Sequence, residues 1–351
     1  MHYTKKGVSL KLNFRRGSAF ATQGARKYLA DIEPEDIKKI TVIRHAAIGD
    51  FMNLRPFLIE LREFFPHASI TLSVLKHYMY GIPYELIDDV HIMHRYKDKK
   101  NDEKATFFTR VKEAKQLAPQ DIIFDLTDST ISVLLVTLAS AKLKIGYPYR
   151  NIRRFFYDMS VLRSEFVLEA DTLMHMLNIL GKKTKVPLDY GYKKQYPKND
   201  IKRIVYFAGA SLEEKCWEKE KFKILIENLS EEFTTYEHIV LQGIGKDEKF
   251  LEIYKPLEDK NNVLLQEVMP IEDVMQFLSD SRCLVSNDTG VRNMAIALET
   301  PTVGIFFATS AFRYWPREAK HDCVFNLEKT SPDVISVFES TKRMIVNLYE
   351  K

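Results

Sequence analysis

Residues 40–70, ITVIRHAAIGDFMNLRPFLIELREFFPHASI, hold the pattern that decides the fold. The β-branched run at 40–44 predicts a buried strand, and the apolar spacing over 51–64 predicts an amphipathic helix. A second apolar run begins at 69. Strands that alternate with helices are typical of a parallel sheet, because parallel strands need a crossover connection. The stretch therefore predicts an α/β fold.

The same alternation continues along the rest of the chain. Further strands are expected at 69–74, 90–93, 122–125 and 142–146, with helices at 107–116 and 128–140. A polar, basic stretch with two prolines, GKKTKVPLDYGYKKQYPKND, follows at 181–200 and is typical of a linker. Beyond it, a second series of strands is expected at 204–207, 238–241, 263–266, 282–286 and 302–306. The pattern predicts two doubly wound domains.

The chain has 351 residues, enough for two domains that each bury a core. We expect a basic N-terminal arm (1–39), a first Rossmann-like domain (40–183), a linker (184–200), a second Rossmann-like domain (201–331) and a C-terminal helix (332–351). One option for that helix is to pack back on the first domain.

Composition excludes several protein classes. The chain is 45% hydrophobic and 28% charged, and it contains no run of about 20 apolar residues that would predict a membrane span. Its N-terminus lacks the apolar core of a secretory signal, so we expect a cytoplasmic protein. Three widely spaced cysteines without a CxxC pair predict neither a disulfide framework nor a zinc site.

Basic residues are concentrated at the N-terminus. Residues 1–30 carry seven lysines and arginines and no acid. An anionic membrane surface would attract such a segment, at very roughly 1 kcal/mol per basic residue. The alternative is a solvated arm without a partner. Nucleic acid is not expected, because no basic–aromatic motif follows.

Polar residues follow three of the predicted strands, where ligands bind in open parallel sheets. Asp50 opens the helix after the first strand, either as a helix N-cap or as a functional carboxylate. Lys215 lies beyond the strand at 204–207, either solvated or placed to neutralise a phosphate. Residues 288–290 precede a helix, where backbone amides form an anion site or only a capping turn. The sequence contains no DxD motif that would suggest a divalent-cation site.

Four segments, taken together, resemble one family. IRHAAIGD is similar to an R/K-x-S-S-x-G-D loop, and GASLEEKCW to a donor loop that ends in K-x-W. SNDTGVRNMAIALETPTVGIFFATS resembles an N-D-T-G-x-x-H-x-A-x-A-L-G-T-P segment that ends in G-P-T. DIIFDLTDSTISVLLVTLASAKLKIGY is similar to D-L-x-G-S-x-x-S-x-x-L-x-x-x-x-A-K-x-x-I-G-Y. In order and spacing, the chain resembles glycosyltransferase family 9, the ADP-heptose:lipopolysaccharide heptosyltransferases.

The resemblance implies a GT-B architecture, with two Rossmann-like domains facing a central cleft. It implies an inverting, metal-independent enzyme that uses ADP-heptose as donor and no cofactor. Asp50 would be the general base, and Lys215 would stabilise the departing diphosphate together with the amides at Asp288, Thr289 and Gly290. The other nucleotide-sugar-binding positions would be Ser211, Asn293 and Thr309.

The implied acceptor is the anionic lipopolysaccharide core, at the inner face of the cytoplasmic membrane. Guanidinium groups match carboxylates and phosphates, so candidate acceptor-binding residues are Arg55, Arg150, Arg153 and Arg154. The run YRNIRR is also typical of a solvated face, and that alternative stays open.

Several positions depart from the family pattern. Asn293 stands where the family has histidine, and it carries no charge. Phe307 and Ala308 replace the glycine and proline of the G-P-T loop, and Asp128 replaces a glycine. Ala46 and Ala47 replace small polar residues. These departures leave two alternatives: the same enzyme with a different nucleotide-sugar donor, or a non-catalytic GT-B scaffold.

Overall fold

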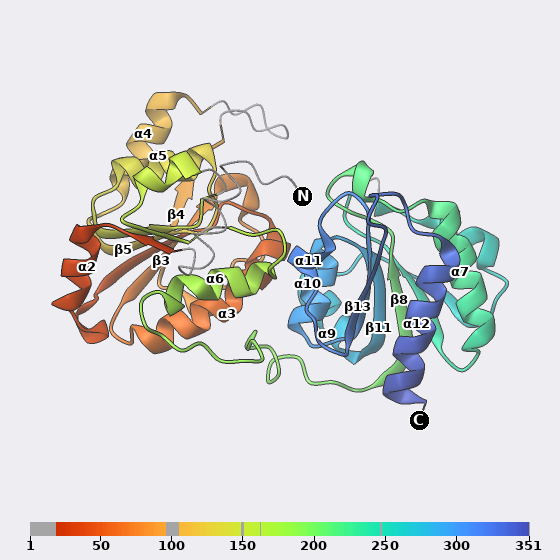
Figure 1. Cartoon of the computed structure of the whole chain (residues 1–351). Coiled ribbons are helices and arrows are strands. Elements are labelled where there is room, and N and C mark those ends of the chain that lie inside the picture. The colour runs from red at the N-terminus through yellow and green to blue at the C-terminus, as the bar shows by residue number, and fades with distance from the viewer. Residues whose placement is uncertain (1–18, 96–104, 149–150, 162, 246–247, 351) are drawn as a thin grey trace, which may run out of the picture. The chain divides into compact units, whose positions relative to one another are not determined.

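The computed structural model describes residues 19–95, 105–148, 151–161, 163–245 and 248–350. The chain divides into two compact units, residues 1–164 with 170–189 and residues 165–169 with 190–351. Each unit is built on one sheet of largely or wholly parallel strands with helices on its faces (Figure 1). The predicted α/β class is confirmed.

The first unit contains a seven-stranded sheet in the order β1-β7-β6-β5-β2-β3-β4. Its strands are β1 (Ala19–Ala21), β2 (Lys39–Ile43), β3 (Ser69–Leu75), β4 (Asp89–Met93), β5 (Gln120–Asp125), β6 (Ala141–Gly146) and β7 (Met159–Val161). All neighbouring strands pair in parallel except β1, which is antiparallel to β7. The five strands predicted for this half of the chain agree with β2 to β6 within two residues at each end.

Helices cover both faces of this sheet. On one face lie α2 (Gln23–Ala30), α3 (Ile48–Phe64) and α6 (Glu169–Asn178), which share a hydrophobic core with Val42. On the other face lie α4 (Phe107–Gln116) and α5 (Thr130–Leu138), whose core contains Ile43. Because successive strand residues point to opposite faces, the single run ITVI supplies both cores.

The sequence reasoning missed the elements at the edge of this sheet. Part of the expected basic arm belongs to the fold, because residues 19–36 form β1, α2 and the 3-10 helix η1 (Pro34–Asp36). Strands β1 and β7 have three residues each, too short to show an alternating pattern. Residues 1–18 lie outside the described part of the chain.

The second unit contains a six-stranded parallel sheet in the order β10-β9-β8-β11-β12-β13. Its strands are β8 (Ile201–Phe207), β9 (Glu237–Leu241), β10 (Val263–Gln266), β11 (Ser281–Asn287), β12 (Thr302–Phe306) and β13 (His321–Phe325). Its helices are α7 (Lys219–Glu232), α8 (Leu251–Tyr254), α9 (Ile271–Asp280), α10 (Gly290–Ala297), α11 (Ala311–Tyr314) and α12 (Val334–Tyr349).

The C-terminal helix α12 packs within the second unit. It contacts α7 and the strands β11, β12 and β13, and it buries Val337 and Ile345 there. The apolar face of α12 therefore belongs to the core of the second unit, and packing of this helix on the first domain remains a prediction. In the described part of the chain, no helix is long and apolar enough to span a membrane.

Candidate active site

The first group of site residues lies at the carboxyl end of β2. Helix α3 begins at Ile48, and its N-cap residue is Ala47, which makes no side-chain capping bond. Asp50 lies in the first turn of the helix, so its interpretation as an N-cap is wrong. Its carboxylate Oδ1 instead accepts a hydrogen bond from Arg44 Nη2 at 2.7 Å.

Arg44 is fixed from several sides. Its side chain is 3% exposed, and its Nη1 donates to the carbonyl of Leu126 and, at 2.8 Å, to Tyr147 Oη. These partners follow β5 and β6, so the guanidinium connects the carboxyl ends of three strands. The Asp50 side chain is 32% exposed. A carboxylate that is held in place and still reached by solvent can accept a proton from a bound hydroxyl.

Arg44 was not among the predicted site residues. The signal was present, because the family loop begins with arginine or lysine at this position. Its contacts make Arg44 a positioning residue for Asp50.

His45, the next residue in this loop, anchors it to the sheet. The imidazole Nε2 lies 3.1 Å from Ser73 Oγ on β3, and that hydroxyl lies 3.0 Å from His91 Nδ1 on β4. Burial lowers the pKa of His45 to about 3, so the ring is neutral at pH 7. The His45 amide also donates to Thr127 Oγ1, which ties this loop to the loop after β5.

The loop after β5 is organised by Asp125, which is fully buried. Its Oδ1 accepts the amides of Thr127 and Asp128, and its Oδ2 accepts the Tyr157 hydroxyl at 2.7 Å. Burial raises the pKa of the Asp125 carboxyl. Asp128 has a φ of 56°, in the left-handed region. That conformation explains why the similar family segment has glycine here, and aspartate tolerates it better than most residues do.

Two of the predicted acceptor-binding arginines are engaged by carboxylates. Arg55 is buried on α3 and forms an ion pair with Glu85. Arg153 Nη1 donates to Asp128 Oδ1 at 2.9 Å. The guanidinium of Arg154 lies over the rings of Phe20 and Phe155, at 5.3 and 5.4 Å.

Arg150 lies outside the described residues. Binding of an anionic acceptor by these arginines remains a prediction.

The second group lies at the carboxyl ends of β8, β11 and β12. Lys215 Nζ donates to Asp288 Oδ2 at 3.0 Å, and Thr309 Oγ1 donates to the same oxygen at 2.8 Å. The side chains of Lys215 and Asp288 are 19% and 9% exposed. Three residues from separate segments of the sequence therefore form one cluster.

This cluster adjoins the start of α10. Thr289 is the N-cap residue, and its side chain makes no capping bond. The first-turn N–H groups of an eight-residue helix are therefore left to other acceptors, which favours an anion there. Asn293, one turn further along α10, is buried.

The loop that carries Lys215 is held by residues that the sequence analysis gave no role. Asn287 Nδ2 donates to the carbonyl of Ala208 at 2.7 Å, and its Oδ1 accepts the amide of Trp217 at 3.0 Å. Trp217 is buried, and its indole N–H donates to the carbonyl of Pro332. The tryptophan of the K-x-W pattern thus anchors the loop, while Ser211 on the same loop is exposed.

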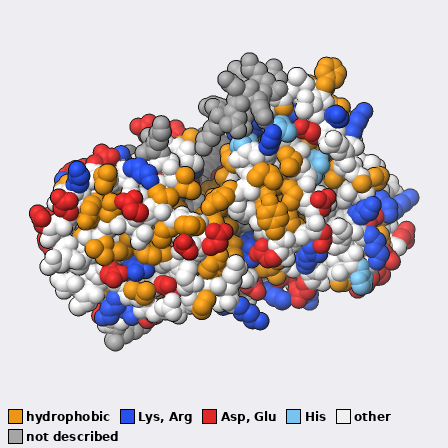
Figure 2. All heavy atoms as spheres, turned by 180° about the vertical axis from the view of Figure 1, so that it is seen from behind, with side chains coloured by type: hydrophobic (Ala, Val, Ile, Leu, Met, Phe, Trp, Pro, Cys, Tyr) orange, Lys and Arg blue, Asp and Glu red, His pale blue; other side chains and the backbone are white. Residues whose placement is uncertain are grey.

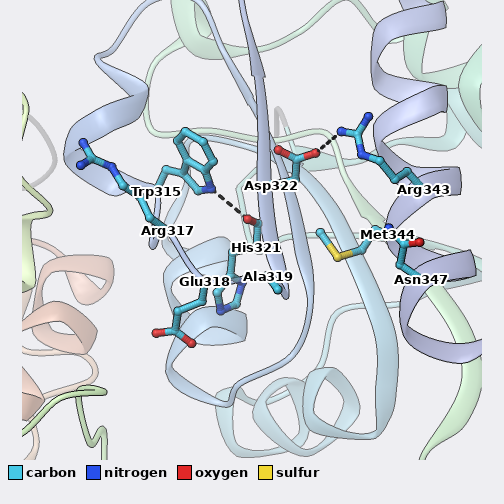
Figure 3. A pocket seen from close by; sticks show the side chains of 9 residues that line it. All are labelled: Trp315, Arg317, Glu318, Ala319, His321, Asp322, Arg343, Met344 and Asn347. Atoms are coloured by element: carbon cyan, nitrogen blue, oxygen red, sulfur yellow. Dashed lines mark hydrogen bonds and ion pairs between the residues drawn. The ribbon is translucent and has the colours of Figure 1, made fainter.

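A separate hollow of about 480 Å³ lies beside β13 and α12 (Figure 3). Trp315 closes one side, where its indole N–H donates to the His321 carbonyl, and the Asp322–Arg343 ion pair lies on the other. None of the predicted site residues lines this hollow. In the described part of the chain, no group of three or more His, Cys, Asp or Glu side chains is placed to hold a metal ion.

Known proteins of one family are similar to this chain. The model of glycosyltransferase family 9 (heptosyltransferase) matches residues 110–341. Lipopolysaccharide heptosyltransferase 3 of Escherichia coli is 23% identical over 291 residues, which cover 76% of this chain and 83% of that protein. Lipopolysaccharide heptosyltransferase 1 of Campylobacter coli is 23% identical over 296 residues, covering 78% and 85%.

Among solved structures, the E. coli heptosyltransferase WaaC with ADP-2-deoxy-2-fluoro heptose shares the fold. Its TM-score is 0.69 at 18% identity, and the match covers 87% of this chain and 99% of that one. The family model spans well over half of the chain, from α4 to the middle of α12. The chain therefore belongs to glycosyltransferase family 9, the heptosyltransferase family.

Proposed function

We propose that the protein transfers a heptose from ADP-heptose to an anionic lipopolysaccharide or lipooligosaccharide core acceptor, with inversion and without a metal ion. The observation that carries the proposal is the Asp50 carboxylate, held by Arg44 at the end of β2 in a chain of this family. A relative of the same fold is described with an ADP-heptose analogue, which supports this choice of donor.

The chemistry is a single displacement. Asp50 takes the proton of the acceptor hydroxyl as its oxygen forms a bond to the anomeric carbon of the sugar. The bond from that carbon to the diphosphate breaks on the opposite face, which inverts the configuration. The electron pair leaves with the diphosphate, whose charge is stabilised by Lys215 and by the first-turn amides of α10.

Fixed donors of this kind can replace a cation at the leaving group, because they are preorganised and need little rearrangement during the reaction. No cofactor is needed besides the donor. Ser211 and Thr309, with their hydroxyls, and Asn293 complete the proposed donor site.

For the acceptor, we propose the arginines at positions 55, 150, 153 and 154. Arg55 and Arg153 would exchange their present carboxylate partners for those of the substrate. The proposed place of action is the inner face of the cytoplasmic membrane.

A different nucleotide-sugar donor is the second candidate function, and Asn293 favours it. An uncharged amide buried in α10 replaces the family's histidine, so the contacts to phosphate or sugar differ. A ligand that binds only the folded state raises the melting temperature of the protein. A larger rise in melting temperature with ADP than with UDP or GDP would support ADP-heptose as the donor. No rise with any of the three would support a non-catalytic scaffold.

The direct test is transfer to heptose-deficient lipopolysaccharide acceptors, with ADP-heptose and with UDP- and GDP-sugars in parallel. We expect a product heavier by one heptose with ADP-heptose, and no mass increase with the UDP- or GDP-sugars. A mass increase from another donor would replace the proposed donor but keep the reaction type. No increase from any donor would refute the proposed activity.

A further inference from the structure

Helix α5 in the first unit has no charged residue. Its sequence, TISVLLVTL, buries Leu135 and Val136 against the sheet, while Ile131, Val133 and Leu134 are only partly covered. Surface helices normally present a charged or polar face to water. The exposed positions of α5 are two threonines, Thr130 and Thr137, so this part of the surface is uncharged.

Exposed aromatic residues flank α5 on both sides. Phe107 and Phe108 lie in the first turn of α4, and Phe108 is 81% exposed. On the other side, the 3-10 helix η4 (Asn151–Phe156) exposes Phe155 by 73%, together with Ile152 and Phe156. Side chains of this size are rarely exposed together without a function.

The three elements are neighbours. Helices α4 and α5 contact each other on the same face of the sheet (Figure 1), and α5 contacts η4. Each follows a strand of the parallel sheet, β4, β5 or β6, so each begins near the carboxyl end of that sheet. The exposed residues of α4 and η4 thus lie near the carboxyl end of the sheet.

Exposed apolar side chains also occur elsewhere on both units, as on most proteins (Figure 2). What distinguishes this surface is its mixture of aromatic and basic side chains. Arg153 and Arg154 lie between Ile152 and the pair Phe155 and Phe156 in η4, and Arg110 follows the two phenylalanines of α4. Aromatic and apolar side chains beside arginine are the composition of segments that lie in a membrane interface.

We propose that this aromatic–basic surface, formed by Phe107 and Phe108 of α4 and by Ile152, Phe155 and Phe156 of η4, docks on an anionic phospholipid membrane. The aromatic side chains enter the boundary between headgroups and acyl chains, and the exposed Lys112, one turn after Phe108 on α4, contacts lipid phosphates. Anionic lipid is the occupant that matches both features, because its headgroups carry the opposite charge and its chains accept the apolar side chains.

The proposed docking surface is connected to the loop that carries Asp50 in the first unit. Arg153 of η4 donates a hydrogen bond to the Asp128 carboxylate. The residue before Asp128 is Thr127, whose hydroxyl oxygen accepts a hydrogen bond from the His45 amide. The proposed surface and the Asp50 loop are therefore connected through directly bonded residues. A membrane held against η4 would present a lipid-anchored acceptor beside that loop.

Binding of the full chain to vesicles tests the proposal. The vesicles contain phosphatidylcholine alone or with phosphatidylglycerol, and binding is measured by co-sedimentation. We expect binding to the anionic vesicles, and a loss of about tenfold or more in the Phe155→Ser/Phe156→Ser variant. The matched control is Ile335→Ser on α12, where the side chain is 74% exposed, and it should bind like the parent.

A second variant reports insertion directly. Phe155→Trp places an indole on η4, whereas the native Trp217 and Trp315 lie in the second unit. Brominated lipids should quench the added fluorescence. Equal binding of all variants, or no quenching, would overturn the proposal, and absence of binding by the parent would leave a protein partner as the occupant.

The consequence for transfer rests on the proposed function, and a soluble acceptor separates the two. With a lipid-free core oligosaccharide, a Phe107→Ser/Phe108→Ser variant should turn over like the parent, and with vesicle-embedded acceptor it should be slower. An equal loss with both acceptors would refute a role in membrane docking. If the proposed reaction is wrong, no form transfers sugar, yet the difference in vesicle binding remains measurable.

Discussion

Replacing Lys215 by methionine tests how the second unit binds a diphosphate. In the parent, the ammonium lies 3.0 Å from Asp288 Oδ2, and both side chains are mostly covered. Methionine keeps much of the side-chain volume but removes the charge, and it leaves the Asp288 carboxylate with Thr309 as its hydrogen-bond donor. A diphosphate would then lose one charge-assisted hydrogen bond and face an unneutralised carboxylate.

A hydrogen bond to a charged group contributes about 1.5–3 kcal/mol. Taking about 2 kcal/mol, because Lys215 is partly solvated, the affinity for ADP should fall about 30-fold. Isothermal titration calorimetry with ADP measures this directly. The double variant Lys215→Met/Asp288→Asn should regain about fivefold, because the unpaired carboxylate is removed.

Lys219→Met is the matched control, since Lys219 lies four residues after Lys215 and forms a surface ion pair with Glu252. It should bind ADP like the parent. ADP affinity in Lys215→Met equal to that of the parent would refute the assignment of Lys215 to the diphosphate.

Three further predictions follow from contacts in the two units. Arg44→Met should lower kcat about 100-fold in steady-state kinetics while ADP affinity stays unchanged, because Asp50 loses the group that positions it. Burial lowers the pKa of His238 to about 4, below its ordinary 6.5, so the unfolded chain takes up the proton first as the pH falls. The parent should then lose roughly 3 kcal/mol of unfolding free energy between pH 7 and 4 from this group, and urea titrations of His238→Gln should show a correspondingly shallower decline. Gly304→Ala should destabilise the fold by about 1–3 kcal/mol in thermal unfolding, because its Cβ would collide with the buried Arg292.

Each of these predictions has a result that contradicts it. Unchanged turnover in Arg44→Met would show that Asp50 needs no positioning. Parallel pH curves for His238→Gln and the parent would mean that His238 is not held neutral. A Gly304→Ala protein as stable as the parent would mean that the Arg292 side chain moves aside without cost.

The central strands of both sheets were predictable from sequence because they are buried on both faces. Runs such as 40–43 (ITVI) and 302–306 (TVGIF) contain no charged residue and are mostly β-branched, which is what a strand between two helix layers requires. The edge strands β1 and β13 escaped prediction. The first has three residues, and β13, HDCVF, is only partly buried and mixes polar with apolar residues.

The candidate site was predictable where a residue type carries its own signal. Asp50, Lys215 and Asp288 follow strands, and the structure brings Lys215 and Asp288 together with Thr309. The roles of Arg44 and Asn287 were not predictable from spacing, because each is held by partners that lie 70 to 103 residues away in the chain.

 Tyr147, which binds Arg44, lies 103 residues after it in the chain, and Ala208, which binds Asn287, lies 79 residues before it. Such contacts exist only once the sheet has formed.

The most direct test of the central claim is turnover by Asp50→Asn, measured as heptose transfer from ADP-heptose to a heptose-deficient acceptor. Asparagine keeps the shape of the side chain but does not accept the acceptor's proton. We predict loss of transfer by about 100-fold or more, with ADP affinity and melting temperature close to those of the parent. Near-normal transfer by the purified variant would contradict the assignment of Asp50 as the general base.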